Sequence, residues 1–421
     1  RSWLDNLKLR FSVGALGNGN VDPYKFLPTM SIDKTGVIVG DGQVNYTSYP
    51  GLIPNNLTWE KVTTYDVGVD VDMFKNRLTI GFDWYRRNTT DMYTVGPTLP
   101  EVLGTTQPKG NYANLKTKGW ELTLSWRDNF KLAGSDFHYG VKFMLWDSQS
   151  WITKYNNATG KLSDYYEGYR IGDIWGYNIE GLFTSYDEIA NHADQDYIKI
   201  SDSKIWQPGD LKFADLNGDG KIDKGAQTLS DHGDLVIVGN EEERYHYGFN
   251  LNVGWKGIGI SAFFQGVGKR DWYPGQETGF FWGKYNRPYG YSLKMHENRW
   301  TEENPNPNAY WPRLVGYSSE NGGRPMGTPN NRYMQDASYL RLKALTVDYS
   351  LPQAWVSKLG LTGLKIYFTG ENLFTFSNIC ENFDPEVIKG GDVDLKDRKG
   401  EEQGYSYPML KTYTVGLNVS F

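Results

Sequence analysis

The chain has 421 residues and a net charge of −6. Of its residues, 39% are hydrophobic, 15% are aromatic and 48 are glycine. No apolar run approaches the roughly 18 residues of a membrane-spanning helix, the single cysteine excludes an internal disulfide, and no basic stripe suits nucleic acid. The many aromatic and glycine residues favour strands joined by turns over a helical bundle.

Alternating apolar and polar positions predict strands along the whole chain. The first apolar face is formed by Leu7, Leu9, Phe11 and Val13. We expect ten strands, carried by the segments 7–13, 62–73, 78–84, 120–126, 137–145, 245–255, 258–264, 340–342, 364–368 and 413–421. A soluble sandwich would alternate in the same way, so the pattern alone does not decide between a sandwich and a membrane barrel.

Three further features favour a barrel. Most of the strands are expected to run for about 10 to 14 residues, long enough to cross a bilayer at a tilt. Several apolar faces end in an aromatic residue of the kind found at membrane interfaces: Trp84, Trp126, Trp255 and Tyr413. Short turns alternate with long connections, which is the pattern of outer-membrane barrels. We therefore predict an all-β fold, a transmembrane antiparallel β-barrel fragment with long extracellular loops.

The alternation of connection lengths also predicts the organisation of the chain. If the turns near residues 76, 131, 256 and 355 are periplasmic, the segment 149–242 begins and ends outside the membrane. We expect barrel strands one to five in 1–148, an extracellular elaboration in 149–242, and strands six to ten in 243–421 with a long loop at 269–335. The last strand then runs inward and leaves the C-terminus in the periplasm.

The motifs of the chain resemble a known family. The ending Tyr-Thr-Val-Gly-Leu-Asn-Val-Ser-Phe at 413–421 is similar to the signal by which outer-membrane barrels are recognised for insertion. The other motifs are N-N-L-T-W-E (55–60), G-W-E (119–121), I-G-D-I-W-G-Y-N-I-E-G-L-F (171–183), D-L-N-G-D-G-K-I-D (215–223), G-E-N-L (370–373) and D-P-E (384–386). Together they resemble the C-terminal part of the barrel of a SusC-like (RagA-like) TonB-dependent outer-membrane transporter.

The resemblance implies the partners and the function. It implies a 22-stranded barrel, so the remaining barrel and plug polypeptide would complete these ten strands. It further implies energy from TonB through the plug region, a SusD-like surface lipoprotein, and oligosaccharide uptake across the outer membrane of a Gram-negative bacterium of the Bacteroidota type. The lipid bilayer would surround the completed barrel. Alternatives are import of peptides, a passive porin, and a secreted glycan-binding β protein.

A calcium site is the most specific chemical prediction. Oxygen-bearing side chains at the first, third, fifth and ninth places and glycine at the sixth match a calcium loop. The twelfth place is Ala226, where such a loop usually has glutamate, so a carboxylate from the following stretch must contribute. The alternative is a turn without metal. The predicted residues of this structural Ca²⁺ site are Asp215, Asn217, Asp219, Lys221, Asp223, Asp231 and Asp234.

The aromatic residues of loop 269–335 and of the preceding elaboration are candidate substrate contacts. Aromatic rings stack on the apolar faces of sugars, so several rings over a lumen could hold a glycan. The alternative is that they pack the loop against itself. The candidates are Trp272, Tyr273, Trp282, Tyr285, Tyr289 and Trp175.

The sequence predicts no enzyme. The five histidines are scattered, with no nucleophile or carboxylate at the spacing of a known catalytic motif, and no phosphate-binding glycine loop occurs. No catalytic residue and no cofactor other than calcium is therefore predicted.

Overall fold

The computed structural model describes residues 3–19, 24, 26–54, 57–105, 107–198, 205–275, 278–285, 290–315, 326–388 and 406–421. Ten of the described strands form one antiparallel sheet, called the wall. In spatial order these are β1 (Leu4–Asn18), β4 (Glu60–Met73), β5 (Leu78–Val95), β6 (Lys109–Leu132), β7 (Ser135–Lys154), β12 (Arg244–Trp255), β13 (Ile258–Lys269), β16 (Tyr339–Ser350), β17 (Gly363–Ser377) and β18 (Thr412–Ser420). Each overlaps one predicted segment, so the prediction of a ten-stranded antiparallel wall is confirmed.

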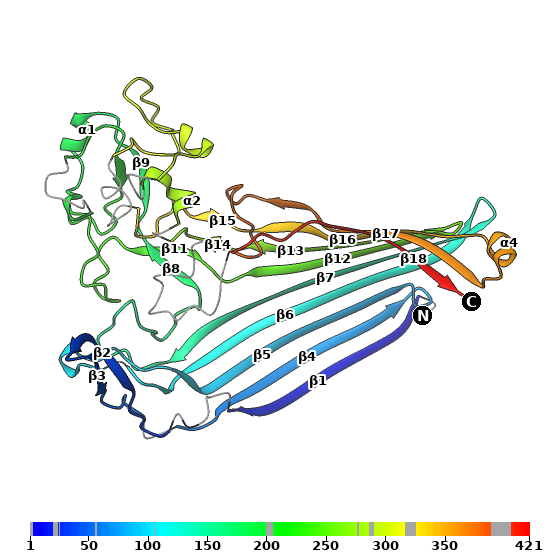
Figure 1. The fold of residues 1–421 in the computed structure, drawn as a ribbon, viewed down its shortest axis with the longest axis horizontal. Helices are drawn as coiled ribbons and strands as arrows, with labels where there is room; N and C mark the ends of the chain where they lie inside the picture. The colour runs from blue at the N-terminus through cyan, green and yellow to red at the C-terminus, as the bar shows by residue number, and fades with distance from the viewer. Residues whose placement is uncertain are drawn as a thin grey trace.

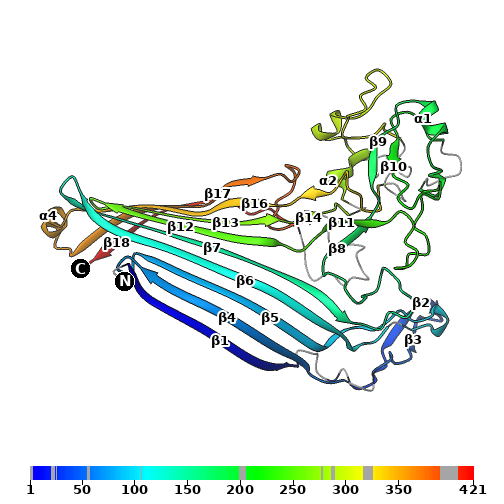
Figure 2. The ribbon, with the colours of Figure 1, turned by 180° about the vertical axis from the view of Figure 1, so that it is seen from behind.

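The connections of the wall separate by length to its two ends. The short ones, 74–77, 133–134, 256–257 and 351–362, lie at one end together with both chain termini, the turn end (Figure 1). The long ones lie at the opposite end, the loop end, which Figure 2 shows from behind. At the turn end Ala133-Gly134 and Lys256-Gly257 have positive φ at both positions, as a type I′ hairpin requires.

The two faces of the wall differ in polarity because side chains alternate along each strand. Leu9 pairs with Val69, and Val69 with Phe82, so apolar side chains form rows across the strands on an outer apolar face. Leu9 is 78% exposed and Phe11 72%. The opposite, polar face carries charged pairs. There Arg10 lies 2.9 Å from Asp70 and 2.7 Å from Asp83, and a side chain at Gly68 would overlap both Asp83 and Arg10.

The strands continue beyond the segments in which alternation is visible. Strand β5 reaches Val95, beyond the predicted segment 78–84, and β6 begins at Lys109, before the predicted segment 120–126. Strand β7 continues to Lys154, so the connection expected to begin at 149 begins at 155. These strand ends near the loop end carry polar residues on both faces, as in Lys116 to Lys118, so hydrophobic periodicity does not mark them.

The loop end contains the main hydrophobic core. Its small strands pair as β8 (Asp173–Gly176) with β11 (Val236–Asn240), β9 (Ile179–Leu182) with β10 (Leu211–Phe213), β14 (Asp271–Trp272) with β15 (Gln335–Asp336), and β2 (Ile32–Val39) with β3 (Gly42–Thr47). Among the described residues, the helices of the loop end are α1 (Tyr186–Ala190), α2 (Gly279–Trp282) and the 3₁₀ helices η1 (Glu101–Leu103), η2 (Asp196–Ile198), η3 (Gly283–Tyr285) and η4 (Lys294–Glu297). Helix α4 (Gln353–Val356) and the 3₁₀ helix η5 (Ser357–Leu359) lie at the turn end (Figure 1). Every helix in the described ranges is too short or too polar to span a membrane.

Candidate functional site at the loop end

The predicted aromatic contacts of the 270–338 connection lie inside the core. Trp272, Tyr273, Trp282 and Tyr285 are all buried, with Trp282 fully so. Tyr285 stacks on Trp311 with ring centroids 5.1 Å apart. Because the rings contact one another, a ligand could reach Trp282 only if this core opened.

The polar atoms of three of these rings are bonded within the same loop region, whereas the buried indole N–H of Trp272 has no hydrogen-bond partner among the described residues. The indole N–H of Trp282 donates to the carbonyl of Gly275 at 2.9 Å, and the Tyr285 hydroxyl donates to the carbonyl of Pro312 at 2.7 Å. The Tyr273 hydroxyl donates to the carbonyl of Met326 at 2.5 Å. These bonds fix the ring orientations, which supports the alternative that the rings hold the loop together.

Of the two remaining aromatic candidates, Trp175 packs against the same core cluster. Trp175 is half-buried on β8 beside His232, with ring centroids 5.5 Å apart. Tyr289 lies outside the described residues. Substrate contact by the six predicted aromatic residues stays a prediction.

The predicted calcium loop forms a compact turn. The two carboxylate oxygens of Asp215 accept from the amides of Gly218 at 2.7 Å and Gly220 at 2.9 Å. Asp219 accepts from the amide of Lys221 at 2.8 Å and from the side-chain amide of Asn217 at 3.1 Å. Gly218 and Gly220 both have positive φ, so the chain turns as sharply as a calcium loop requires.

The carboxylates expected to complete the site lie against this turn. Asp234 is fully buried and accepts from the amides of Leu216 at 2.7 Å and Asp223 at 2.9 Å, so it joins the two ends of the loop. Asp231 accepts from the amide of Ala226 at 3.0 Å. Within the described ranges, no three His, Cys, Asp or Glu side chains converge as metal ligands. The residue types fit Ca²⁺, while the carboxylates here bind main-chain amides.

His296 is a buried titratable group that the sequence did not single out. Its Nε2 lies 2.8 Å from the carbonyl oxygen of Phe281, and its Nδ1 accepts from the amide of Leu293 at 2.9 Å. A neutral imidazole with its proton on Nε2 satisfies both bonds. Burial lowers the pKa of His296 below its ordinary value, and the neighbouring positive charge of Arg299 acts in the same direction. The ring therefore serves the packing of the loop as a neutral group.

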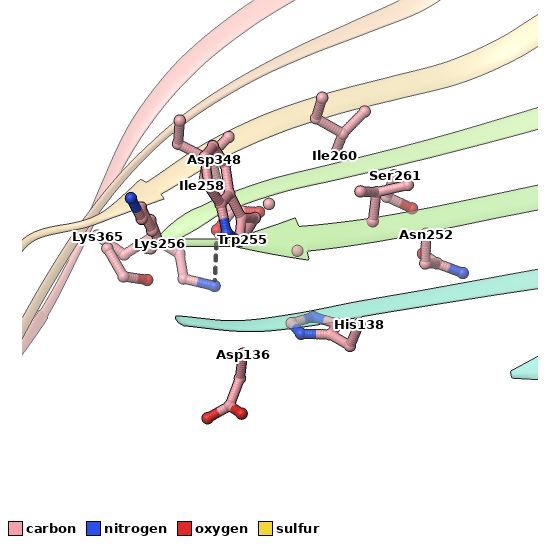
Figure 3. A pocket seen from close by; sticks show the side chains of 15 residues that line it. Asp136, His138, Asn252, Trp255, Lys256, Ile258, Ile260, Ser261, Asp348 and Lys365 are labelled. Carbon is pink, nitrogen blue, oxygen red and sulfur yellow. Dashed lines mark ion pairs between the residues drawn. The ribbon is translucent and has the colours of Figure 1, made fainter. Parts of the chain in front are cut away.

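A depression of about 450 Å³ with polar and apolar lining lies far from this core, at the turn end. His138 of β7, Asn252 of β12 and Asp348 of β16 line it (Figure 3). Lys365 of β17 pairs with Asp348 at 3.1 Å. A Cβ at Gly254 would overlap the His138 ring, so this glycine makes room for the imidazole. No predicted site residue lines the depression.

Comparison with known proteins identifies the family. The family described as "TonB dependent receptor-like, beta-barrel" matches residues 2–219, more than half of the chain. The chain belongs to the TonB-dependent receptor β-barrel family. This membership confirms the predicted recognition and fold class, and it is incompatible with the alternative of a secreted β sandwich.

Individual relatives of this family match almost the whole chain. TonB-dependent receptor P3 of Formosa agariphila is 29% identical over 98% of this chain and 39% of its own length. TonB-dependent receptor SusC of Bacteroides thetaiotaomicron is 25% identical over 99% of this chain and 38% of its own length. The chain thus spans about two fifths of these relatives.

A solved structure shares the fold. The structure titled "Structure of the RagAB peptide transporter" superposes with a TM-score of 0.70 at 22% identity, covering 100% of this chain and 41% of that one. The likeness extends over the wall and the loop end together.

Proposed function

We propose that this chain forms part of the wall of an outer-membrane barrel that imports oligosaccharides in a TonB-dependent manner. In this proposal a SusD-like surface lipoprotein accompanies the barrel, TonB acts through a plug region, and the chain catalyses no reaction. The outer apolar face carries the proposal, because exposed side chains such as Leu9 and Phe11 lose contact with water when lipid covers them.

The open edges of the wall support completion by further polypeptide. Strands β1 and β18 are the first and last strands of the sheet, so each has one edge without a described partner strand. Unpaired main-chain groups are not tolerated in the hydrocarbon layer. The remaining barrel and plug polypeptide would pair with these edges and close the lumen against the polar face.

The lengths of the connections support one orientation in the membrane. Outer-membrane barrels have short periplasmic turns and long extracellular loops. We therefore place the turn end in the periplasm and the loop end outside. The C-terminus then lies in the periplasm, in the outer membrane of a Gram-negative, Bacteroidota-like bacterium.

Peptide import is the second candidate function. The similar solved structure is that of a peptide transporter, which favours it. Oligosaccharide import is favoured by the aromatic composition of the loop end, where Tyr291 and Phe280 remain exposed beside the buried core. Both candidates use the same wall and the same energy source.

We also propose that the turn around Asp215, Asn217, Asp219 and Asp223 binds a structural Ca²⁺. The donor types, the glycine positions and the approach of Asp234 support it. Bound Ca²⁺ would offset the repulsion of these carboxylates and stiffen the turn.

Uptake by the complete receptor tests the function. Cells carrying it, with and without its surface lipoprotein, would be given fluorescently labelled oligosaccharides and oligopeptides of similar size. We expect oligosaccharide uptake that requires TonB. Uptake of peptides alone would select the second candidate, and uptake that persists without TonB would contradict both.

A further inference from the structure

The segment 379–388 lies on the polar face of the wall near the loop end. It follows β17 and contains the Asp384-Pro385-Glu386 motif. Arg341 of β16, only 2% exposed, donates to Asp384 at 2.5 Å and to Glu386 at 2.6 Å. Its Nε donates to the hydroxyl of Thr375 on the neighbouring strand at 2.9 Å. One buried guanidinium thus joins two wall strands to this segment.

Further cations and amides hold the same motif. Lys343 donates to Glu386 at 2.8 Å. Arg270 donates to the carbonyl of Pro385 at 3.2 Å and to Glu243 at 2.9 Å. The second carboxylate oxygen of Asp384 accepts from the amide of Met409 at 2.9 Å. The motif is therefore held from β16, from the ends of β12 and β13, and from the chain that returns to β18.

The other side of the segment contacts the aromatic core. The ring of Phe383 lies 4.9 Å from that of Trp272, centroid to centroid. Phe383 and Ile388 are buried members of the same core cluster as Trp282. The segment is thus packed between the wall and the core, with charges on one side and apolar side chains on the other.

The wall is locally irregular where it holds the segment. The pairing of β16 with β17 shifts register between Leu342 and Ala344, and that with β13 shifts between Phe263 and Phe264. A shift of this kind re-aims side chains. Arg341 and Lys343 both reach Glu386 across this irregularity.

We propose that Arg341 and Lys343 are positioning residues that latch segment 379–388 to the polar face and thereby fix the aromatic core over the wall. A buried guanidinium is costly unless it is paired, so the latch favours one placement of the segment. The effect of this latch on transport rests on the proposed import function. Substrate then passes the loop end at full rate only when segment 379–388 and the aromatic core are held in place.

The test uses the complete receptor in outer-membrane preparations and compares five variants with the parent, of which Lys343→Met is used for the second readout. Arg341→Met leaves the partly buried carboxylates of Asp384 and Glu386 without their guanidinium partner, and Asp384→Asn with Glu386→Gln leaves the guanidinium without a carboxylate partner. A third variant combines all three changes, so that of the four charged groups only Lys343 remains, without its carboxylate partner. Arg10→Met is the matched control, because Arg10 also holds two carboxylates on the polar face but contacts only wall strands.

Hydrogen exchange of residues 379–388 is the first readout. We expect Arg341→Met to speed hydrogen exchange in residues 379–388 by about a hundredfold, because removing one partner of a buried ion pair is strongly destabilising. The combined variant should recover part of that protection, and Arg10→Met should leave it unchanged. The latch would be overturned if Arg341→Met left the exchange rate of residues 379–388 unchanged, or if Arg10→Met raised it equally. Strictly additive changes of that rate in the combined variant would also overturn the latch.

Uptake is the second readout and separates this inference from the proposed function. Arg341→Met should lower the maximal uptake rate several-fold while the half-saturating substrate concentration and barrel assembly stay those of the parent. Lys343→Met, which keeps the Arg341 contacts, should have a smaller effect. If Arg341→Met takes up substrate at the rate of the parent although residues 379–388 exchange faster, the positioning role of Arg341 is overturned. If the parent imports neither oligosaccharide nor peptide, the proposed function fails, while the exchange comparison still decides whether the latch exists.

Discussion

The wall and the loop end use apolar residues in opposite ways. In the wall, large apolar side chains point outward and are exposed, while charged pairs such as Arg10 with Asp70 lie on the other face. At the loop end, Trp282 and Trp311 are fully buried inside an aromatic core. Among the described residues, the apolar clusters of the wall are smaller than the core of the loop end, so the main stabilisation of the wall must come from main-chain pairing and from lipid. The loop end packs as a soluble domain does.

The largest effect is expected in the loop core. Trp282→Ala removes a fully buried indole and should destabilise the loop end by about 3–5 kcal/mol, because the cavity cannot refill. Phe280→Ala, on the same helix but 43% exposed, is the control and should cost far less. Protease resistance of the loop end measures both variants. Equal resistance in the two would contradict the packing account.

The next effect is expected on the outer apolar face. Ile80→Arg should cost about 2–4 kcal/mol if the side chain meets lipid near the bilayer midplane. Thr79→Arg, one residue earlier and on the polar face, should be tolerated better. Heat-modifiable migration of the assembled barrel on gels reports assembly. Assembly that is impaired equally by both variants would argue against a two-faced wall.

Calcium removal should loosen the turn around Asp219 and spare the wall. A ligand present at about 100 times its dissociation constant stabilises the bound state by about 2.7 kcal/mol, so chelation should speed exchange in residues 210–240. Calorimetric titration of the chelated receptor should then show Ca²⁺ uptake that Asp219→Ala abolishes. Lack of uptake by the parent would reject the site.

A smaller effect is expected where two loops touch. A side chain at Gly176 would overlap the carbonyl of Pro329, a main-chain atom that cannot move aside easily, so Gly176→Ala should cost about 1–3 kcal/mol. Gly181→Ala is the matched control, since a methyl group added there would meet no atom within 4 Å. Thermal unfolding of the loop end compares the two. Similar midpoints would mean that the loops are not held together at Gly176.

The smallest effect is a graded dependence on pH. Because the pKa of His296 is lower in the folded loop than in an opened one, the opened state binds protons more readily below the ordinary value of about 6.5. Protection from exchange around residues 290–298 should be full above that pH and decline as the pH falls. His296→Gln should remove this dependence, and an unchanged pH profile in that variant would assign it to another group.

The wall can be predicted from sequence, whereas much of the loop end cannot. Lipid on one side and water on the other impose a period of two, so Leu78, Ile80 and Phe82 mark their strand without an alignment. That signal ends where both faces are polar, which is why it does not reach the ends of β5 to β7. Periodicity also carries no information on pairs such as Arg341 with Asp384, 43 residues apart.

The orientation of aromatic rings at the loop end is a second feature that the sequence does not predict. Trp282 inside the core and Phe280 on its surface lie two residues apart on the same short helix, and composition treats them alike. Only the tertiary packing separates a ring that holds the loop from one that a ligand can touch. The carboxylates around Asp215 can be grouped into one turn from sequence because their spacing is local.

A spin-label scan of β5 measures whether the outer apolar face of the wall contacts lipid. Single labels would be placed at each position from 78 to 84 on β5 of the complete receptor in a bilayer, and their accessibility to oxygen and to a water-soluble nickel complex would be compared. Strict alternation is expected, with labels at 78, 80, 82 and 84 in lipid and those at 79, 81 and 83 reached by the nickel complex or shielded by protein. Uniform contact with water along the strand would contradict it.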